Sequence, residues 1–248
     1  MPLQEPLQLF LVRIEMKAVI LAGGLGTRIS EETHNKPKPM IKIGPLTLIE
    51  HIMNIYALAG ITEFIIATGY LHEVIDEYFK NYAKYQVRTF YTGDSTQTGG
   101  RIKRVFEEFP EENFCVTYGD GLANINIAET LRFHKMHEKL ATLTAVRPTA
   151  RFGRLTIKDG VVTEFREKMQ SEEGWVNGGF FILNKNVCDF ISGDEIPFEL
   201  DPLKNLTVNG QLYAYQHYGF WSPVDTLREK NELEVLWNSG NAPWVSNL

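Results

Sequence analysis

A glycine-rich stretch followed by basic residues carries the clearest sign of chemistry in this sequence. It spans residues 21–28 (LAGGLGTR), directly after the apolar run Lys17–Ile20, and Lys38 follows in the segment KPKP. Glycines allow backbone N–H groups to approach phosphate oxygens, and arginine offers a planar cationic fork that matches them. The pattern is neither the dinucleotide motif G-x-G-x-x-G nor a P-loop. We therefore predict a phosphate site of a different kind, with an ordinary glycine-rich turn as the alternative.

Two aspartates, Asp120 and Asp225, are the candidate metal ligands. Asp120 lies in a Gly-Asp-Gly sequence after the apolar run 114–117, which would bring its carboxylate to the carboxyl edge of a sheet, beside the predicted phosphates. Asp225 lies just before a helical segment that runs through Trp237, where helix N-capping is the alternative role. Carboxylates together with phosphate oxygens suit Mg²⁺.

Hydrophobic patterning predicts the elements that position these residues. Short apolar runs predict buried strands, and apolar residues at helical spacing predict helices at 48–59 and 74–79; the strands are expected at 17–20, 64–67, 87–91 and 114–117. This alternation predicts an α/β fold with parallel strands and right-handed crossovers. The polar loop 91–101 would lie over the carboxyl edge of the sheet, where ligands bind, although a solvated connection is the alternative.

The second half of the chain is richer in predicted strands, which are expected at 141–146, 153–157, 161–165 and 179–183. Asp159-Gly160 predicts a hairpin turn between two of them. We expect this half to cap the first. Glu167-Lys168 follows one strand and the segment 175–179 leads into another, so both could line a pocket for a small polar ligand.

Two histidines, His134 and His137, lie three residues apart in a helix predicted over residues 127–138. That spacing could place both rings on one helix face. Since the neighbouring sequence offers no clear third zinc ligand and is strongly polar, we interpret them as surface histidines.

Length and composition indicate a single soluble domain. The chain has 248 residues, 44% of them hydrophobic, and a formal net charge of −6, which argues against nucleic-acid binding. Cys115 and Cys188 lie in separate apolar segments and are expected to be reduced core residues, which favours a cytoplasmic location. The apolar run LFLV near the start is too short to span a membrane and lacks the features of a signal peptide, so no membrane association is expected.

Together these motifs resemble the signature of the sugar-1-phosphate nucleotidyltransferases, most closely the glucose-1-phosphate cytidylyltransferases among them. The likeness extends over residues 16–248 and rests on the stretches 23–33, 98–101, 139–145, 219–228 and 236–244. It implies a Rossmann-like, three-layer α/β fold with a mixed, mostly parallel sheet. It also implies one nucleotidyltransferase domain, 16–248; residues 1–15 before it are expected to be an accessory extension or an artefact of an upstream start.

The resemblance implies attack by an oxygen of a sugar 1-phosphate on the α-phosphorus of a nucleoside triphosphate, which yields a nucleotide-sugar and pyrophosphate. CTP and glucose 1-phosphate are the favoured substrates, Mg²⁺ is the implied cofactor, and a homo-oligomer is expected. The reaction needs positioning and charge neutralisation, so it requires no nucleophilic side chain.

Matching positions imply the residue roles. Arg28, Lys38, Asp120 and Asp225 are the implied catalytic residues: Arg28 binds the triphosphate, Lys38 stabilises charge at the α-phosphate, and the two aspartates coordinate Mg²⁺. The implied nucleotide-binding residues are Leu21, Ala22, Gly23, Gly24, Gly26, Thr27, Arg28, Thr98, Gly99 and Gly100. The implied sugar-phosphate-binding residues are Glu167, Lys168, Asn177 and Gly178.

Two departures from the family pattern leave the substrates open. The segment 81–92 is short where the cytidylyltransferase pattern carries an insertion, and Met169 follows Glu167-Lys168 where proline is usual. A different triphosphate, or another sugar or polyol phosphate, is therefore an alternative. A catalytically silent ligand-sensing homologue, or a nucleotide-binding module without chemistry, is a further one.

Overall fold

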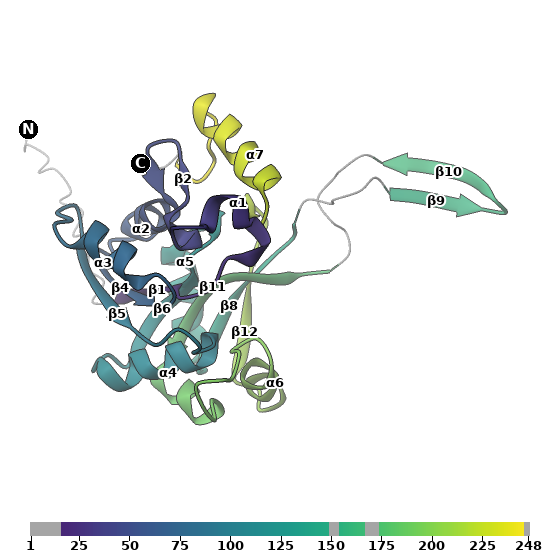
Figure 1. Ribbon diagram of the computed structural model, residues 1–248. Coiled ribbons are helices and arrows are strands. Elements are labelled where there is room, and N and C mark those ends of the chain that lie inside the picture. Colours follow the sequence, from purple (N-terminus) through teal and green to yellow (C-terminus); the bar gives the residue numbers. More distant parts are fainter. Residues whose placement is uncertain (1–15, 149–153, 167–173, 246–248) are drawn as a thin grey trace, which may run out of the picture.

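A seven-stranded sheet forms the centre of the computed structural model, which describes residues 16–148, 154–166 and 174–245 (Figure 1). The strand order is β12-β8-β11-β6-β1-β4-β5, and every neighbouring pair is parallel except those that β11 makes with β6 and β8. The strands are β1 (Lys17–Ala22), β4 (Glu63–Thr68), β5 (Gln86–Tyr91), β6 (Asn113–Tyr118), β8 (Ala141–Val146), β11 (Val176–Asn184) and β12 (Leu212–His217). The predicted mixed, mostly parallel sheet is confirmed.

Helices cover both faces of the sheet, which gives three layers (Figure 1). Alternate residues of β1 belong to two separate cores: Ala18 and Ile20 pack on one face, and Val19 and Leu21 on the other. The first face is covered by α2 (Leu48–Ala57), α3 (His72–Phe79) and α5 (Ile127–His137), with α7 (Leu227–Asn238) beside them. The second face is covered by α4 (Thr98–Glu108) and α6 (Asp201–Val208).

Several short elements connect the layers. Two small antiparallel ladders join β2 (Lys42–Ile43) to β3 (Leu46–Thr47) and β7 (Gly121–Ala123) to β13 (Trp221–Pro223). The short helix α1 (Ser30–Thr33) follows the glycine-rich loop, and 3₁₀ helices form at Thr27–Ile29, Lys38–Met40 and Lys185–Phe190. None of these short pieces has enough residues for its hydrophobic period to be read from sequence.

The expectation that the second half caps the first is wrong. β8, β11 and β12 extend the same sheet, because β11 pairs antiparallel with β6 and carries β8 and β12 alongside. The predicted hairpin of β9 (Arg154–Lys158) and β10 (Val161–Arg166) does form and projects from the body (Figure 1). Its turn residues Asp159 and Gly160 have φ of 51° and 80°. Hydrophobic periodicity predicts where a strand lies in the sequence, but it does not predict which strands are its neighbours in the sheet.

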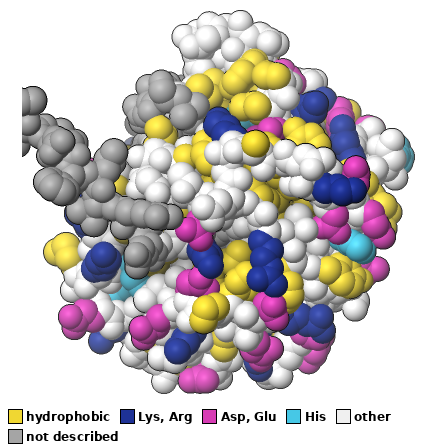
Figure 2. All heavy atoms as spheres, turned by 90° about the vertical axis from the view of Figure 1, so that its left-hand side faces the viewer, with side chains coloured by type: hydrophobic (Ala, Val, Ile, Leu, Met, Phe, Trp, Pro, Cys, Tyr) yellow, Lys and Arg dark blue, Asp and Glu magenta, His cyan; other side chains and the backbone are white. Residues whose placement is uncertain are grey.

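The surface near α3 and β5 carries charges of both signs. Figure 2 shows acidic and basic side chains interspersed over this face. This face thus presents no continuous basic track among the residues that the structure describes. Within the same ranges, none of the helices is both long and apolar enough to span a bilayer. Both cysteines are free thiols; Cys115 is buried and Cys188 half-buried.

The interpretation of His134 as a surface histidine is wrong, because α5 turns that ring inward. Only 8% of His134 is exposed, and its Nδ1 lies 2.9 Å from Thr142 Oγ1, while His137 Nε2 lies 2.7 Å from the same oxygen. His137 also stacks on Tyr213, with ring centroids 4.4 Å apart. A threonine hydroxyl can donate to one ring and accept from the other, so both histidines serve the packing of α5 on β8 and β12.

We expect His134 to make stability dependent on pH. Burial lowers the pKa of His134 to about 4, whereas the unfolded chain has a value of about 6.5. The unfolded state therefore binds more protons between these values, and the folded state loses stability as the pH falls from 6.5 toward 4. His134→Gln should reduce this loss by up to about 3 kcal/mol in urea unfolding across that range. An unchanged slope of unfolding free energy against pH would contradict the role of His134.

Candidate active site

The glycine-rich loop leaves the carboxyl end of β1 near the middle of the sheet. Leu21 and Ala22 are buried as the last residues of the strand, so they could reach a ligand only through their backbone. Gly26 has a φ of +63°, in the left-handed region that favours glycine, and its carbonyl accepts a hydrogen bond from Thr33 Oγ1 at 3.1 Å. Gly24, Thr27 and Arg28 are exposed. The predicted loop therefore forms and faces solvent.

A buried arginine, Arg101 of α4, lies directly beneath this loop. Its guanidinium donates to the carbonyls of Gly23 at 3.0 Å and Thr68 at 2.8 Å, and to Thr92 Oγ1 at 2.5 Å. These acceptors lie at the carboxyl ends of β1, β4 and β5, and Arg101 is only 3% exposed. Burial lowers the pKa of Arg101, because a charged guanidinium is costly to remove from water. Arg101 thus ties three strand ends together under the predicted phosphate site.

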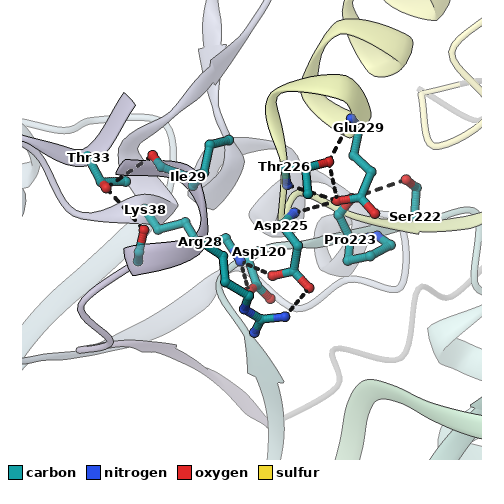
Figure 3. A network of polar contacts seen from close by, with 11 residues as sticks. Arg28, Ile29, Thr33, Lys38, Asp120, Ser222, Pro223, Asp225, Thr226 and Glu229 are labelled. Atoms are coloured by element: carbon teal, nitrogen blue, oxygen red, sulfur yellow. Dashed lines mark hydrogen bonds and ion pairs between the residues drawn. The ribbon is translucent and has the colours of Figure 1, made fainter. Parts of the chain in front are cut away.

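Four predicted residues meet in one network of charges (Figure 3). Lys38 Nζ donates to Asp120 Oδ2 at 2.5 Å and to Asp225 Oδ1 at 2.6 Å, and Arg28 donates to Asp225 Oδ2 at 2.6 Å. Lys38 is buried, whereas the Arg28 side chain is largely exposed. The structure therefore brings the predicted catalytic residues together, although 187 residues separate Lys38 from Asp225.

The ladder between β7 and β13 sets the two aspartates side by side. Asp120 directly precedes β7, and Asp225 follows β13 by two residues. Pro223 pairs with Gly121 in this ladder, and Val224 N donates to Asp120 O at 2.9 Å. A two-stranded antiparallel pair fixes its register through such bonds. Because both carboxylates contact the same Nζ, their oxygens lie within about 5 Å of each other.

The alternative role of Asp225 as a helix cap is wrong. α7 is capped by Thr226, whose side chain accepts from Glu229 N at 3.3 Å while Glu229 Oε2 accepts from Thr226 N at 2.9 Å. This reciprocal capping box satisfies two helix N–H groups without Asp225. The carboxylate of Asp225 therefore turns to Lys38 and Arg28 (Figure 3).

A close approach at Gly119 positions Lys38. Gly119 N donates to Leu21 O at 3.1 Å, which joins β6 to β1 just before Asp120. A Cβ at Gly119 would lie 2.8 Å from the ring of Pro39 and 2.9 Å from Leu21 O. The segment Lys38–Met40 can thus pack over the end of β6 only because this residue has no side chain.

The donors in this network fit a hard divalent cation. Among the described residues, no group of three or more histidine, cysteine, aspartate or glutamate side chains could hold a metal ion. Two carboxylates are nevertheless sufficient for Mg²⁺, which keeps waters and accepts phosphate oxygens as its remaining ligands. Lys38 now neutralises Asp120 and Asp225, so a metal ion would have to replace its Nζ at one or both.

A second network of hydrogen bonds surrounds the hydroxyl group of Tyr118. Glu199 accepts hydrogen bonds from the Tyr118 hydroxyl and, at 2.6 Å, from Thr98 Oγ1. Asn177 Nδ2 lies 3.3 Å from the same tyrosine oxygen, and its Oδ1 accepts from Gly179 N at 2.9 Å. Burial and the neighbouring Glu199 carboxylate raise the pKa of Tyr118. Since Tyr118 lies two residues before Asp120, it links Thr98 and Asn177 to the end of β6.

The remaining predicted positions differ in how the structure treats them. Gly99 and Gly100 begin α4 rather than an open loop, and added Cβ atoms would lie 2.5 Å from Ile196 O and 2.6 Å from Asp194. Packing thus explains both glycines, and their nucleotide role stays a prediction. Gly178 is buried, and its carbonyl accepts from Trp221 Nε1 at 2.8 Å. Glu167 and Lys168 lie outside the described residues.

The sequence predicts no role for Arg101, Tyr118 or Glu199. Arg101 directly follows the glycine pair, and an arginine beside glycines that open a helix is a detectable sign of close packing. Tyr118 directly follows the predicted strand 114–117, so its position at the sheet edge could have been inferred. No sequence pattern points to Glu199, because it lies in a turn that is distant in sequence from both Thr98 and Tyr118.

Comparisons with known proteins agree with this geometry. A model of the nucleotidyl transferase family matches residues 17–229. The chain is 48% identical to a glucose-1-phosphate cytidylyltransferase of Salmonella typhimurium, with 92% of this chain and 98% of that protein covered. It is 40% identical to a probable glucose-1-phosphate cytidylyltransferase of Bacillus subtilis, with 92% and 99% covered. The crystal structure of HddC from Yersinia pseudotuberculosis shares the fold, with a TM-score of 0.70 at 24% identity, over 90% of this chain and 99% of that one.

The alignments also show a difference in length. They run over 253 and 252 positions, more than the 248 residues of this chain, so both bacterial cytidylyltransferases carry residues without a counterpart here. Such an absence is expected between residues 81 and 92, where only residues 80–85 join α3 to β5. The family match over most of the chain and the identity to full-length relatives lead to one conclusion: the chain belongs to the nucleotidyl transferase family.

Proposed function

We propose that this chain transfers a cytidylyl group from CTP to glucose 1-phosphate and releases pyrophosphate. The observation that carries the proposal is the network in which Lys38 bridges Asp120 and Asp225, next to Arg28 and the glycine-rich loop. The 48% identity to the cytidylyltransferase of Salmonella typhimurium supports these substrates, since the alignment covers nearly all of both chains.

The proposed reaction is an in-line displacement at the α-phosphorus of CTP. An oxygen of the sugar phosphate forms the new bond to phosphorus, and the bond to the bridging oxygen of the β-phosphate breaks, so pyrophosphate leaves with that electron pair. Backbone N–H groups of residues 23–27 and the Arg28 guanidinium would hold the triphosphate. The buried Lys38 ammonium would then face the oxygens on which negative charge grows during displacement.

We further propose that Asp120 and Asp225 hold Mg²⁺ when substrate is bound. The ion would supply positive charge to the phosphate oxygens and hold the triphosphate in one geometry. Release of Lys38 by the two aspartates would then make the Lys38 ammonium available to the substrate. The arrangement of the described residues supports this exchange, because both carboxylates already share one cation.

Pyrophosphate release tests the proposal directly. Purified protein is incubated with Mg²⁺ and each common nucleoside triphosphate, crossed against a panel of sugar 1-phosphates that includes glucose 1-phosphate. We expect the highest kcat/KM for CTP with glucose 1-phosphate, and we expect excess EDTA to abolish turnover because the phosphate charge is then unneutralised. Added Mg²⁺ should restore the full rate.

Other results of this panel would change the assignment in defined ways. The highest kcat/KM with another pair would keep the chemistry and replace CTP or glucose, a result that the missing alignment positions make worth testing. Binding of a triphosphate without any turnover would favour a ligand-sensing homologue. Turnover that survives EDTA would contradict the metal role of the two aspartates.

We also propose a cytoplasmic homo-oligomer that consists of one catalytic domain, 16–248, and an accessory segment, 1–15. The free thiols of Cys115 and Cys188 support a reducing compartment. The family model begins at residue 17, which supports the proposed boundary.

A further inference from the structure

A cationic and aromatic cluster formed by Arg147, Trp175 and Tyr218 lies at the same edge of the sheet as the proposed active site. In the sheet register, Val146 of β8 lies opposite Val176 of β11 and His217 of β12. Arg147 follows Val146, so it emerges between the residue before β11, Trp175, and the residue after β12, Tyr218. Three strands thus bring three residues together that are distant in sequence.

The aromatic rings orient the guanidinium. Arg147 Cζ lies 4.6 Å from the centroid of the Trp175 ring, and Trp175 meets Tyr218 edge to face with centroids 5.0 Å apart. Stacking on an indole holds an arginine side chain by its flat face and leaves its N–H groups directed outward in one plane. Trp175 is half-buried and Tyr218 is 66% exposed, so aromatic surface remains accessible beside the cation.

One donor of Arg147 is buried without a partner. Among the residues that the structure describes, Arg147 Nε is shielded from solvent and makes no hydrogen bond. A buried N–H group without an acceptor is unfavourable, and such groups in native proteins call for an explanation. A small turn of the side chain that brings Nε to a ligand oxygen at this edge of the sheet would remove the cost.

The topology relates this cluster to the catalytic network. β6 and β8 are both antiparallel to β11, so their carboxyl ends point to the same edge, with β11 between them. Neighbouring strands are about 4.8 Å apart, which places the ends of β6 and β8 roughly 10 Å from each other. Asp120 follows β6, Arg147 follows β8, and Asn177 of β11 lies between them. That span matches a hexose phosphate whose phosphate lies beside Lys38, the partner of Asp120.

We propose that Arg147 is a sugar-binding residue that determines acceptor specificity. Its guanidinium donates hydrogen bonds to the hydroxyl oxygens of the acceptor hexose farthest from the phosphate, and Trp175 with Tyr218 packs against the apolar face of the sugar ring. The inference rests on the proposed function, because it takes a sugar 1-phosphate as the acceptor. The proposed sugar subsite is formed by residues other than the glycine-rich loop and the two aspartates.

The test compares wild type with Arg147→Met and Arg147→Lys, using whichever hexose 1-phosphate of the panel gives the highest wild-type kcat/KM. We expect Arg147→Met to raise KM for that sugar phosphate about tenfold or more while KM for the triphosphate stays within about twofold, since only the acceptor loses a charged donor. Arg147→Lys should recover part of the loss, because it keeps the charge without the planar fork. Arg132→Met is the matched control, since Arg132 is an exposed arginine of α5.

Deoxy analogues separate recognition from mere packing. A site built to hydrogen-bond a hydroxyl discriminates against an analogue that lacks it. Wild type should prefer the parent sugar over its 4-deoxy or 6-deoxy 1-phosphate about tenfold or more, and Arg147→Met should reduce that preference to about threefold or less. A folded Arg147→Met with the same preference and the same KM values as Arg132→Met would overturn the inference. If wild type releases no pyrophosphate with any pair, the proposed function itself fails.

Discussion

Replacing Lys38 with methionine is expected to lower kcat by about a hundred- to a thousandfold. Methionine keeps most of the buried apolar stem but removes the ammonium that contacts Asp120 and Asp225. Loss of one preorganised donor aimed at developing charge has an effect of this size. The measurement is steady-state pyrophosphate release at saturating triphosphate and sugar phosphate, with kcat and kcat/KM compared with wild type.

Stability measurements control for damage to the fold. In Lys38→Met, two carboxylates remain within about 5 Å of each other with less neutralising charge, so their repulsion should lower the thermal midpoint in EDTA. Added Mg²⁺ should raise the midpoint of the variant more than that of wild type, because the ion no longer competes with Nζ. A folded Lys38→Met enzyme with near-native kcat would show that this lysine does not act on the substrate.

Gly23→Ala is expected to destabilise the protein by about 3 kcal/mol and to weaken triphosphate binding strongly. The added Cβ would lie 2.0 Å from Arg101 Cζ. An exposed arginine could move aside, but this one is buried and bonded to Gly23, Thr68 and Thr92. Its displacement would remove the hydrogen bonds by which one guanidinium joins three strand ends, and would leave a buried cation without its acceptors. Urea unfolding and calorimetric titration with triphosphate measure the two effects.

Gly24→Ala is the matched control for this prediction. A Cβ at Gly24 has no atom within 4 Å, so the variant should unfold at the same urea concentration as wild type. Arg101→Met should reproduce the loss of stability without any clash at residue 23. Equal stability of Gly23→Ala and Gly24→Ala would refute the view that Arg101 supports the phosphate loop.

The elements with strong hydrophobic periods could be predicted from sequence. β1, β4 and β6 are largely apolar runs, which indicates strands that are buried on both faces. α2 repeats its apolar residues at helical spacing, which indicates a helix with a buried face. The position of the Asp120 carboxylate is predictable because this residue comes just after such a strand. The pairing of the strands is not predictable in this way. β11 runs antiparallel between β6 and β8, and no local sequence pattern indicates that direction.

The rest of the site depends on long-range packing. His134 lies in a polar segment, and only its burial and its hydrogen bond with Thr142 show that the ring faces inward. Glu199 reaches Thr98 and Tyr118 across about a hundred residues of chain, a distance that composition and spacing do not encode. The approach of Arg147 to Trp175 and Tyr218 likewise follows from sheet register alone.

Thr226 and Glu229 cap α7 by themselves, and this separates two properties that a single aspartate often combines. The start of the helix and the charge at residue 225 are set by different side chains. Substitutions at residues 226 and 229 can therefore change the stability of α7 without changing the Asp225 carboxylate at the centre of the network. Asp225 can equally be replaced while a well-folded helix is retained, which is the route by which a family member would become a silent binder.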